Sequence, residues 1–162
     1  MNNTTYLSKV TFSQSKPIPG EYPRVSHLIK QKNLLYFSYK MSLTKNLATF
    51  ILLKLMRSFN VPDLNIHFIR GRYQAQGGYV EGPGTAEILL PSKSRPKNCS
   101  PEGYLTLGVI LHEFAHVLKQ RGEQYDDQTP EHGKVFCLVL DRLLLYTFKN
   151  LIPEIYPHVA LF

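Results

Sequence analysis

Hydrophobic and polar positions in the first half of the chain predict one helix followed by a small sheet. Apolar residues recur at helical spacing over residues 43–59, with Ser42 or Thr44 as the cap and Pro62 beyond the end. Apolar and polar residues then alternate in part, and glycine and proline turn signals divide this stretch. The pattern indicates a three-stranded antiparallel sheet, with strands at residues 64–69, 72–80 and 85–90.

One apolar stripe predicts a helix in the second half of the chain. Ser100 is its predicted cap and Pro101 its first residue, a position where the missing N–H of proline costs nothing. The helix is expected to run to about Gln120, with Gly122 as its natural C-terminal residue. The stripe repeats at helical spacing and consists of Leu107, Ile110, Leu111, Phe114 and Leu118.

The two ends of the chain complete the predicted architecture. A last helix is expected to begin near residues 132–133 and to end at Pro153. Residues 1–41 are predicted to be an irregular basic arm, because closely spaced prolines and a glycine interrupt any regular element. Within this arm, the segment 33–39 is either a short strand or a packed arm. The expected fold class is α+β, with residues 42–162 forming the folded domain.

The composition fits a globular protein of single-domain size. The chain has 162 residues, of which 43% are hydrophobic and 19% are charged. Cys99 and Cys137 are too few for a disulfide framework or a four-cysteine zinc site, so both are expected to be reduced thiols. The N-terminus lacks the apolar run of a signal peptide, and the most apolar segment, 47–56, is too short to span a membrane. We therefore expect a soluble cytoplasmic protein without membrane contact.

Positive charge is concentrated in the first part of the chain. The formal net charge is +7, but residues 1–75 carry eleven basic and two acidic residues, a net +9, and the remainder is −2. A basic part beside a mildly acidic part suggests a polyanion or an acidic partner, so DNA contact through the basic N-terminal part is one prediction. The cations form no tight run, and scattered lysines that keep a helix and a tail soluble are the favoured explanation.

The segment His112-Glu113-Phe114-Ala115-His116 lies within the second predicted helix. Two histidines four residues apart project from one face, so their imidazole nitrogens can converge on one zinc ion at about 2.0–2.1 Å. Glu113 can accept a proton from a metal-bound water as a general base. Gly108 lies one turn before the first histidine, and polar residues beside a small neighbour suit a cleft. The alternative is two histidines on an ordinary solvated or packed helix face.

A catalytic zinc site needs a third protein ligand and one open position. His132 is favoured, because it stands sixteen residues after His116 at the start of the last predicted helix, and the acidic segment between them can turn the chain back. Glu131 is the rival, since some zinc peptidases use a carboxylate ligand. The histidines expected to be ordinary polar residues are His27, His67 and His158.

These residues give the chain a resemblance to the SprT-like zinc metallopeptidases. Their pattern of a helical HExxH and a His-Gly-x-x-Phe at the next helix is similar to His112–His116 followed by His132–Phe136, within residues 43–150. The resemblance implies a minimal zincin-like domain in which His112, His116 and His132 bind Zn²⁺ and Glu113 is the general base. Many relatives have Pro-Glu where this chain has Lys134-Val135, and many carry a zinc ribbon that two cysteines cannot build. The best-known relatives degrade proteins crosslinked to DNA.

The sequence therefore predicts a cytoplasmic zinc endopeptidase with a protein or peptide substrate. Tyr125 and Tyr104 are candidates for a second group that stabilises the oxyanion. The strand at residues 85–90 is a candidate edge for binding an extended peptide. One alternative is a nucleic-acid or protein binding module whose zinc is structural or vestigial. The other is a zinc hydrolase that acts on something other than peptides.

Overall fold

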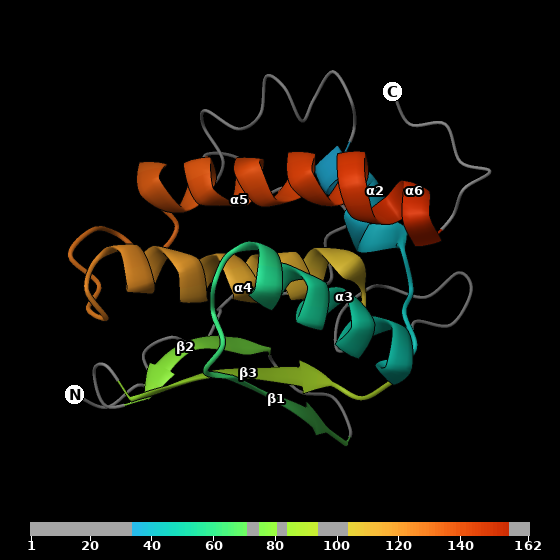
Figure 1. Ribbon diagram of the computed structural model, residues 1–162, viewed down its shortest axis with the longest axis horizontal. Coiled ribbons are helices and arrows are strands. Elements are labelled where there is room, and N and C mark those ends of the chain that lie inside the picture. The colour runs from blue at the N-terminus through green and yellow to red at the C-terminus, as the bar shows by residue number, and fades with distance from the viewer. Residues whose placement is uncertain (1–33, 71–74, 81–83, 94–103, 156–162) are drawn as a thin grey trace.

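Helices cover one face of a three-stranded sheet in the computed structural model, which describes residues 34–70, 75–80, 84–93 and 104–155. The elements in chain order are α2 (Leu34–Lys40), α3 (Lys45–Ser58), β1 (Leu64–Ile69), β2 (Gln76–Val80), β3 (Thr85–Pro91), α4 (Leu107–Gly122), α5 (Lys134–Tyr146), the π-helical segment η2 (Thr147–Leu151) and α6 (Ile152–Ile155). Figure 1 shows α3 and α4 above the sheet and α5 on the far side of α4. The predicted α+β class is confirmed.

The sequence predicts the first two helices unequally well. α3 lies within the predicted residues 43–59, and the Thr44 hydroxyl accepts a hydrogen bond from the Leu47 N–H at 3.2 Å, as an N-cap does. The segment interpreted as a strand or a packed arm is the helix α2, so the strand is wrong. Residues 1–33 of the predicted arm lie outside the described residues. The buried hydrophobic side chains of α2, which packs on α4, are Leu34, Leu35 and Tyr39.

The sheet is mixed, which corrects the prediction of an antiparallel one. β3 lies between the other two strands, and it pairs parallel with β1 and antiparallel with β2. Its alternate residues Ala86, Ile88 and Leu90 are all apolar and fully buried, which favours the central place. The chain therefore leaves β1, forms β2 two strand positions away, and then fills the position between them with β3. In the described sheet, β1 and β2 are the edge strands.

Helix α4 lies at the centre of the structure and begins later than predicted. The Thr106 hydroxyl accepts a hydrogen bond from the Val109 N–H at 3.3 Å and caps the helix. The residues just before it are extended, because the Leu43 N–H donates to the Leu105 carbonyl at 3.0 Å in a short bridge. The predicted start at residues 100–101 lies outside the described residues. The helix ends at the predicted glycine.

Two glycines allow neighbouring elements to approach α4 closely. Residues 107–117 of this helix are all buried. A Cβ at Gly77 of β2 would lie 2.2 Å from the Glu113 carbonyl oxygen, so only glycine fits there. A Cβ at Gly108 would come within 2.6 Å of the Tyr39 ring from α2. The position that suggests a cleft in the sequence is therefore occupied by an aromatic ring.

The C-terminal helices extend further than the sequence predicts. α5 begins directly after Gly133, close to the predicted start. The chain then continues through η2 and α6, so Pro153 does not end the helical region. The π-helical turn of η2 directly precedes this proline, so the regular hydrogen-bond ladder that an interior proline would break is already interrupted there. The described residues contain no helix with the length and apolar character that crossing a membrane requires.

We expect Gly77→Ala to lower the free energy of unfolding by at least about 2 kcal/mol, because its Cβ would collide with the backbone of α4. Gly122→Ala is the matched control, since a Cβ at the end of α4 meets no atom within 4 Å. Urea unfolding followed by circular dichroism measures both. Equal stability of the Gly77 variant and the wild type would contradict the close approach of β2 to α4.

Candidate metal centre

Two histidines of α4 face the same side of the helix, one turn apart. The Nε2 atoms of His112 and His116 lie 3.1 Å from each other, and their ring centroids are 4.8 Å apart. Their spacing of four residues places them on one face, as the sequence predicts. His112 is 0% exposed and His116 is 3% exposed, so neither imidazole lies on a solvated surface.

The third histidine comes from the segment between α4 and α5. The Nε2 of His132 lies 3.1 Å from the Nε2 of His112 and 3.1 Å from that of His116. The three nitrogens form an equilateral triangle and lie close enough to hold one metal ion. His132 is half-buried, so solvent reaches the cluster at this residue. Glu131, the rival ligand, is half-buried and is not part of this group.

Hydrogen bonds between the three rings cannot satisfy the triangle. A neutral imidazole nitrogen either donates through its N–H or accepts through its lone pair. Three nitrogens share these two roles, so at least two of them have the same role. One of the three 3.1 Å contacts must then join two lone pairs or two N–H groups. A cation bound by three lone pairs removes the conflict, which is the form in which histidine binds metals.

The surroundings of the triangle keep its imidazoles neutral. Desolvation lowers the pKa of His112 and His116 well below the ordinary value, and the neighbouring histidines lower it further. The pKa of His132 is lowered to about 4, first by desolvation and then by the positive charge of Lys119. All three imidazoles are therefore neutral at neutral pH, and each can bind a metal ion through Nε2 when its remaining proton is on Nδ1.

The ring of Phe136 contacts all three histidines. Its centroid lies 4.9 Å from that of His112, 4.6 Å from that of His116 and 5.0 Å from that of His132. The residue is fully buried in the first turn of α5. The sequence marks it only as an apolar residue of the last helix and as part of the motif. Its position shows that it also restricts how the imidazole rings can turn.

Glu113 is carried on the same helical turn as the two α4 histidines. It follows His112 directly and precedes His116 by three residues, so it lies beside their common face. The residue is fully buried, and its backbone carbonyl is the group that Gly77 of β2 approaches. A buried carboxyl group beside a possible metal site is the arrangement that proton transfer to or from a bound water needs.

Three polar residues in the last turn of α4 hold the surroundings of the site, and no motif in the sequence predicts their role. Gln120 accepts a hydrogen bond from the Tyr79 N–H at 2.8 Å. Arg121 donates to the Tyr79 hydroxyl at 2.6 Å and to Asp63 at 3.0 Å. Lys119 is buried and donates to the segment that leads to α5. Lysine is almost never fully buried, so the sequence gives no reason to expect a buried lysine at this position.

The remaining candidates contribute other contacts. The Tyr125 ring packs on Tyr79 with centroids 4.8 Å apart, and Tyr104 is half-buried before the bridge that precedes α4. His67 is exposed on β1, 3.8 Å from Glu87. The Cys137 side chain is buried, and its thiol donates to the His132 carbonyl at 3.9 Å. The candidates that lie outside the described residues are His27, Cys99 and His158.

Comparisons with protein-family models, curated proteins and solved structures found no match to this chain. The resemblance to the SprT-like family therefore stays a prediction. Since a fold class alone does not define an activity, the function has to be inferred from the chemistry of the site.

We expect His132→Ala to weaken Zn²⁺ binding by at least about 100-fold, because it removes one of three converging nitrogens, and even an outer partner of a ligand contributes 10–100-fold. Glu131→Ala is the matched control and should bind Zn²⁺ within about twofold of the wild type. Competition with a chromophoric chelator measures both affinities. The reverse ranking of the two variants would show that the carboxylate, and not the imidazole, is the third ligand.

Proposed function

We propose that this protein is a zinc-dependent endopeptidase that hydrolyses peptide bonds. The observation that carries the proposal is the triangle of three neutral imidazole nitrogens, each 3.1 Å from the others, on the helix that also carries Glu113. The HExxH spacing on α4 and the half-buried histidine before α5 supply the residue types that zinc peptidases use.

Zinc is the metal that fits this group of ligands best. Two nitrogens bound at 2.0–2.1 Å to a tetrahedral zinc ion stand about 3.3 Å apart. The nitrogens here stand 3.1 Å apart, so a shift of a few tenths of an ångström is enough. Three imidazoles without a carboxylate favour zinc over magnesium or calcium. The group found among the described residues has three members, which leaves one position of a tetrahedral ion open, as in catalytic zinc sites.

Glu113 is proposed to be the general base. Bound zinc would lower the pKa of a coordinated water to about 7 and polarise the carbonyl group of the substrate. With a metal ion bound, the carboxylate of Glu113 would accept a proton from the water as its oxygen attacks the peptide carbonyl, and it would donate that proton to the amine as the C–N bond breaks. Complete burial of Glu113 keeps bulk water from competing for the proton.

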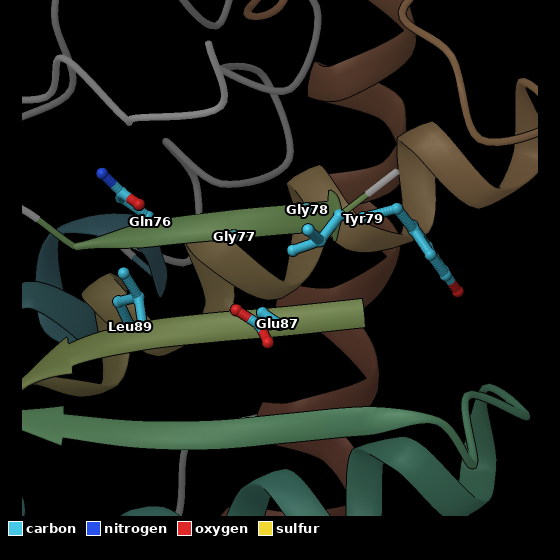
Figure 2. Close-up of a pocket in the computed structure, with 7 residues that line it drawn as sticks. Gln76, Gly77, Gly78, Tyr79, Glu87 and Leu89 are labelled. Atoms are coloured by element: carbon cyan, nitrogen blue, oxygen red, sulfur yellow. The ribbon is translucent and has the colours of Figure 1, made fainter. Parts of the chain in front are cut away.

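β2 replaces the strand at residues 85–90 as the proposed peptide-binding edge. β3 is paired on both sides, so no peptide can add to it, whereas β2 is an edge strand of the described sheet. Gly77 of β2 contacts the backbone of Glu113, so a peptide added there would run beside the proposed general base. Figure 2 shows Gln76, Glu87 and Leu89 along a shallow groove on the opposite face of the sheet, so this groove is separate from the proposed peptide-binding edge.

The alternative is a binding module whose zinc is only structural. Residues 1–33, which lie outside the described residues, carry +4 of the net +9 that suggests DNA contact, and this contact stays a prediction. A structural role for zinc predicts that the metal binds and that no protein is cleaved. The same is true of a zinc hydrolase with another substrate, except that small esters or amides would then be hydrolysed.

We expect Glu113→Gln to keep Zn²⁺ and to lose peptide cleavage by about 10²–10⁴-fold, because the amide cannot accept the proton. Cleavage of a denatured, fluorescently quenched protein measures the activity, and metal analysis of the same sample measures the zinc. Glu154→Gln, which changes an exposed residue of α6, is the control and should cleave like the wild type. Cleavage by the Glu113 variant at the wild-type rate would remove the proposed mechanism.

A further inference from the structure

Lys119 is a buried cation one turn beyond His116 on α4. Its side chain is 0% exposed, and an ammonium group has three N–H donors. All three have acceptors: Nζ donates to Glu123 Oε2 at 2.9 Å, to Asp127 Oδ1 at 3.0 Å and to the Thr129 carbonyl at 3.0 Å. These three acceptors compensate for a burial that would be very costly without partners.

The three acceptors of Lys119 all belong to the connection between α4 and α5, residues 123–133. Glu123 also accepts a hydrogen bond from the Gln128 N–H at 3.2 Å and another from the Thr129 hydroxyl. The ammonium of Lys119 and the carboxylate of Glu123 therefore hold residues 123 and 127–129 of the connection together. Two carboxylates, Glu123 and Asp127, therefore face the single positive charge of Lys119 and compensate it in full.

The connection adopts a backbone that needs such support. Gln124 and Tyr125 have φ angles of 60° and 72°, in the left-handed region that residues with a Cβ disfavour. Gln120 holds this turn, because its carbonyl accepts the Tyr125 N–H at 2.7 Å and its side-chain amide donates to the Tyr125 carbonyl at 3.0 Å. The bonds of Lys119 fix the remainder of the connection up to Thr129.

A tight turn links Thr129 rigidly to the metal site. The Gly133 N–H donates to the Pro130 carbonyl at 3.1 Å, and this turn contains His132. Proline fixes one backbone angle of the turn, and a Cβ at Gly133 would lie 3.2 Å from the proline ring. The position of the Thr129 carbonyl on Lys119 therefore determines where the His132 imidazole can reach.

We propose that Lys119 is a positioning residue that folds the 123–131 segment over the end of α4 and so brings His132 into the metal site. The inference rests on the proposed zinc site and adds a residue that does not touch the metal. A direct effect of its charge would have the opposite sign, because a nearby ammonium repels a metal cation. Neutralising Lys119 should strengthen metal binding if the charge dominates, and should weaken it if positioning dominates.

The test uses the full chain with Lys119→Met, a neutral side chain of similar length. We expect Zn²⁺ affinity to fall about 10–100-fold, as for other groups that orient a ligand. The visible spectrum of bound Co²⁺ should change from the intense bands of a four-coordinate ion toward the weak bands of His132→Ala. Lys134→Met, which removes an exposed lysine at the start of α5, is the matched control and should match the wild type.

A double-mutant cycle separates positioning from general stabilisation. If Lys119 acts through His132, Lys119→Met should lower the Zn²⁺ affinity of the His132→Ala variant by less than about twofold. An equal loss in both backgrounds, or an unchanged or tighter affinity in the wild-type background, would overturn the inference. If Lys119→Met does not fold, as judged by circular dichroism, Asp127→Asn is subjected to the same cycle with the same expected pattern and the same overturning result.

The results also separate this inference from the proposed function. A wild-type chain that binds no Zn²⁺ would remove both. A wild-type chain that binds Zn²⁺ and cleaves protein, together with a Lys119→Met variant of full affinity, would remove only the positioning role. If the wild-type chain binds Zn²⁺ without cleaving protein, and the double-mutant cycle gives the expected result, the positioning role stands and the proposed peptidase activity is ruled out.

Discussion

Three imidazole nitrogens held 3.1 Å apart in a desolvated place are the constraint on which the rest of the structure depends. Each ring is kept neutral, and three neutral nitrogens cannot all pair with one another. The folded chain alone therefore leaves a conflict at its centre, which one cation would resolve. Because α4 and the segment before α5 both contribute nitrogens, such a cation would also link these two parts of the chain, in addition to the hydrogen bonds from Lys119.

The close packing around α4 follows from this placement. Gly77 lets β2 touch the helix backbone at Glu113, and Gly108 accommodates the Tyr39 ring one turn before His112. Phe136 then closes the side of the triangle that faces α5. The two glycines let backbone and aromatic groups come close to α4, and the Phe136 ring keeps the imidazoles from turning. Together they leave the side chains of the site little conformational freedom.

The sequence predicts what depends on local patterns and misses what depends on distant contacts. The periodicity of α3, the positions of the strands and the convergence of the two α4 histidines are local, so they could be predicted. The sheet order depends on which strand buries more apolar surface, and α2 forms from a segment whose pattern is ambiguous without α4 beside it. His132 could be proposed from its spacing. Lys119 could not, since its burial exists only after residues 123–129 fold around it.

The edge of β2 and the last turn of α4 together restrict how a peptide could enter the proposed site. The Tyr79 N–H is already donated to Gln120, so this amide cannot pair with an added strand. Pairing is then confined to the part of β2 that precedes Tyr79, where Gly77 lies against Glu113. The same turn of α4 anchors through Lys119 the segment that carries His132. One helical turn thus limits the proposed peptide-binding edge on one side and supports the proposed third ligand on the other.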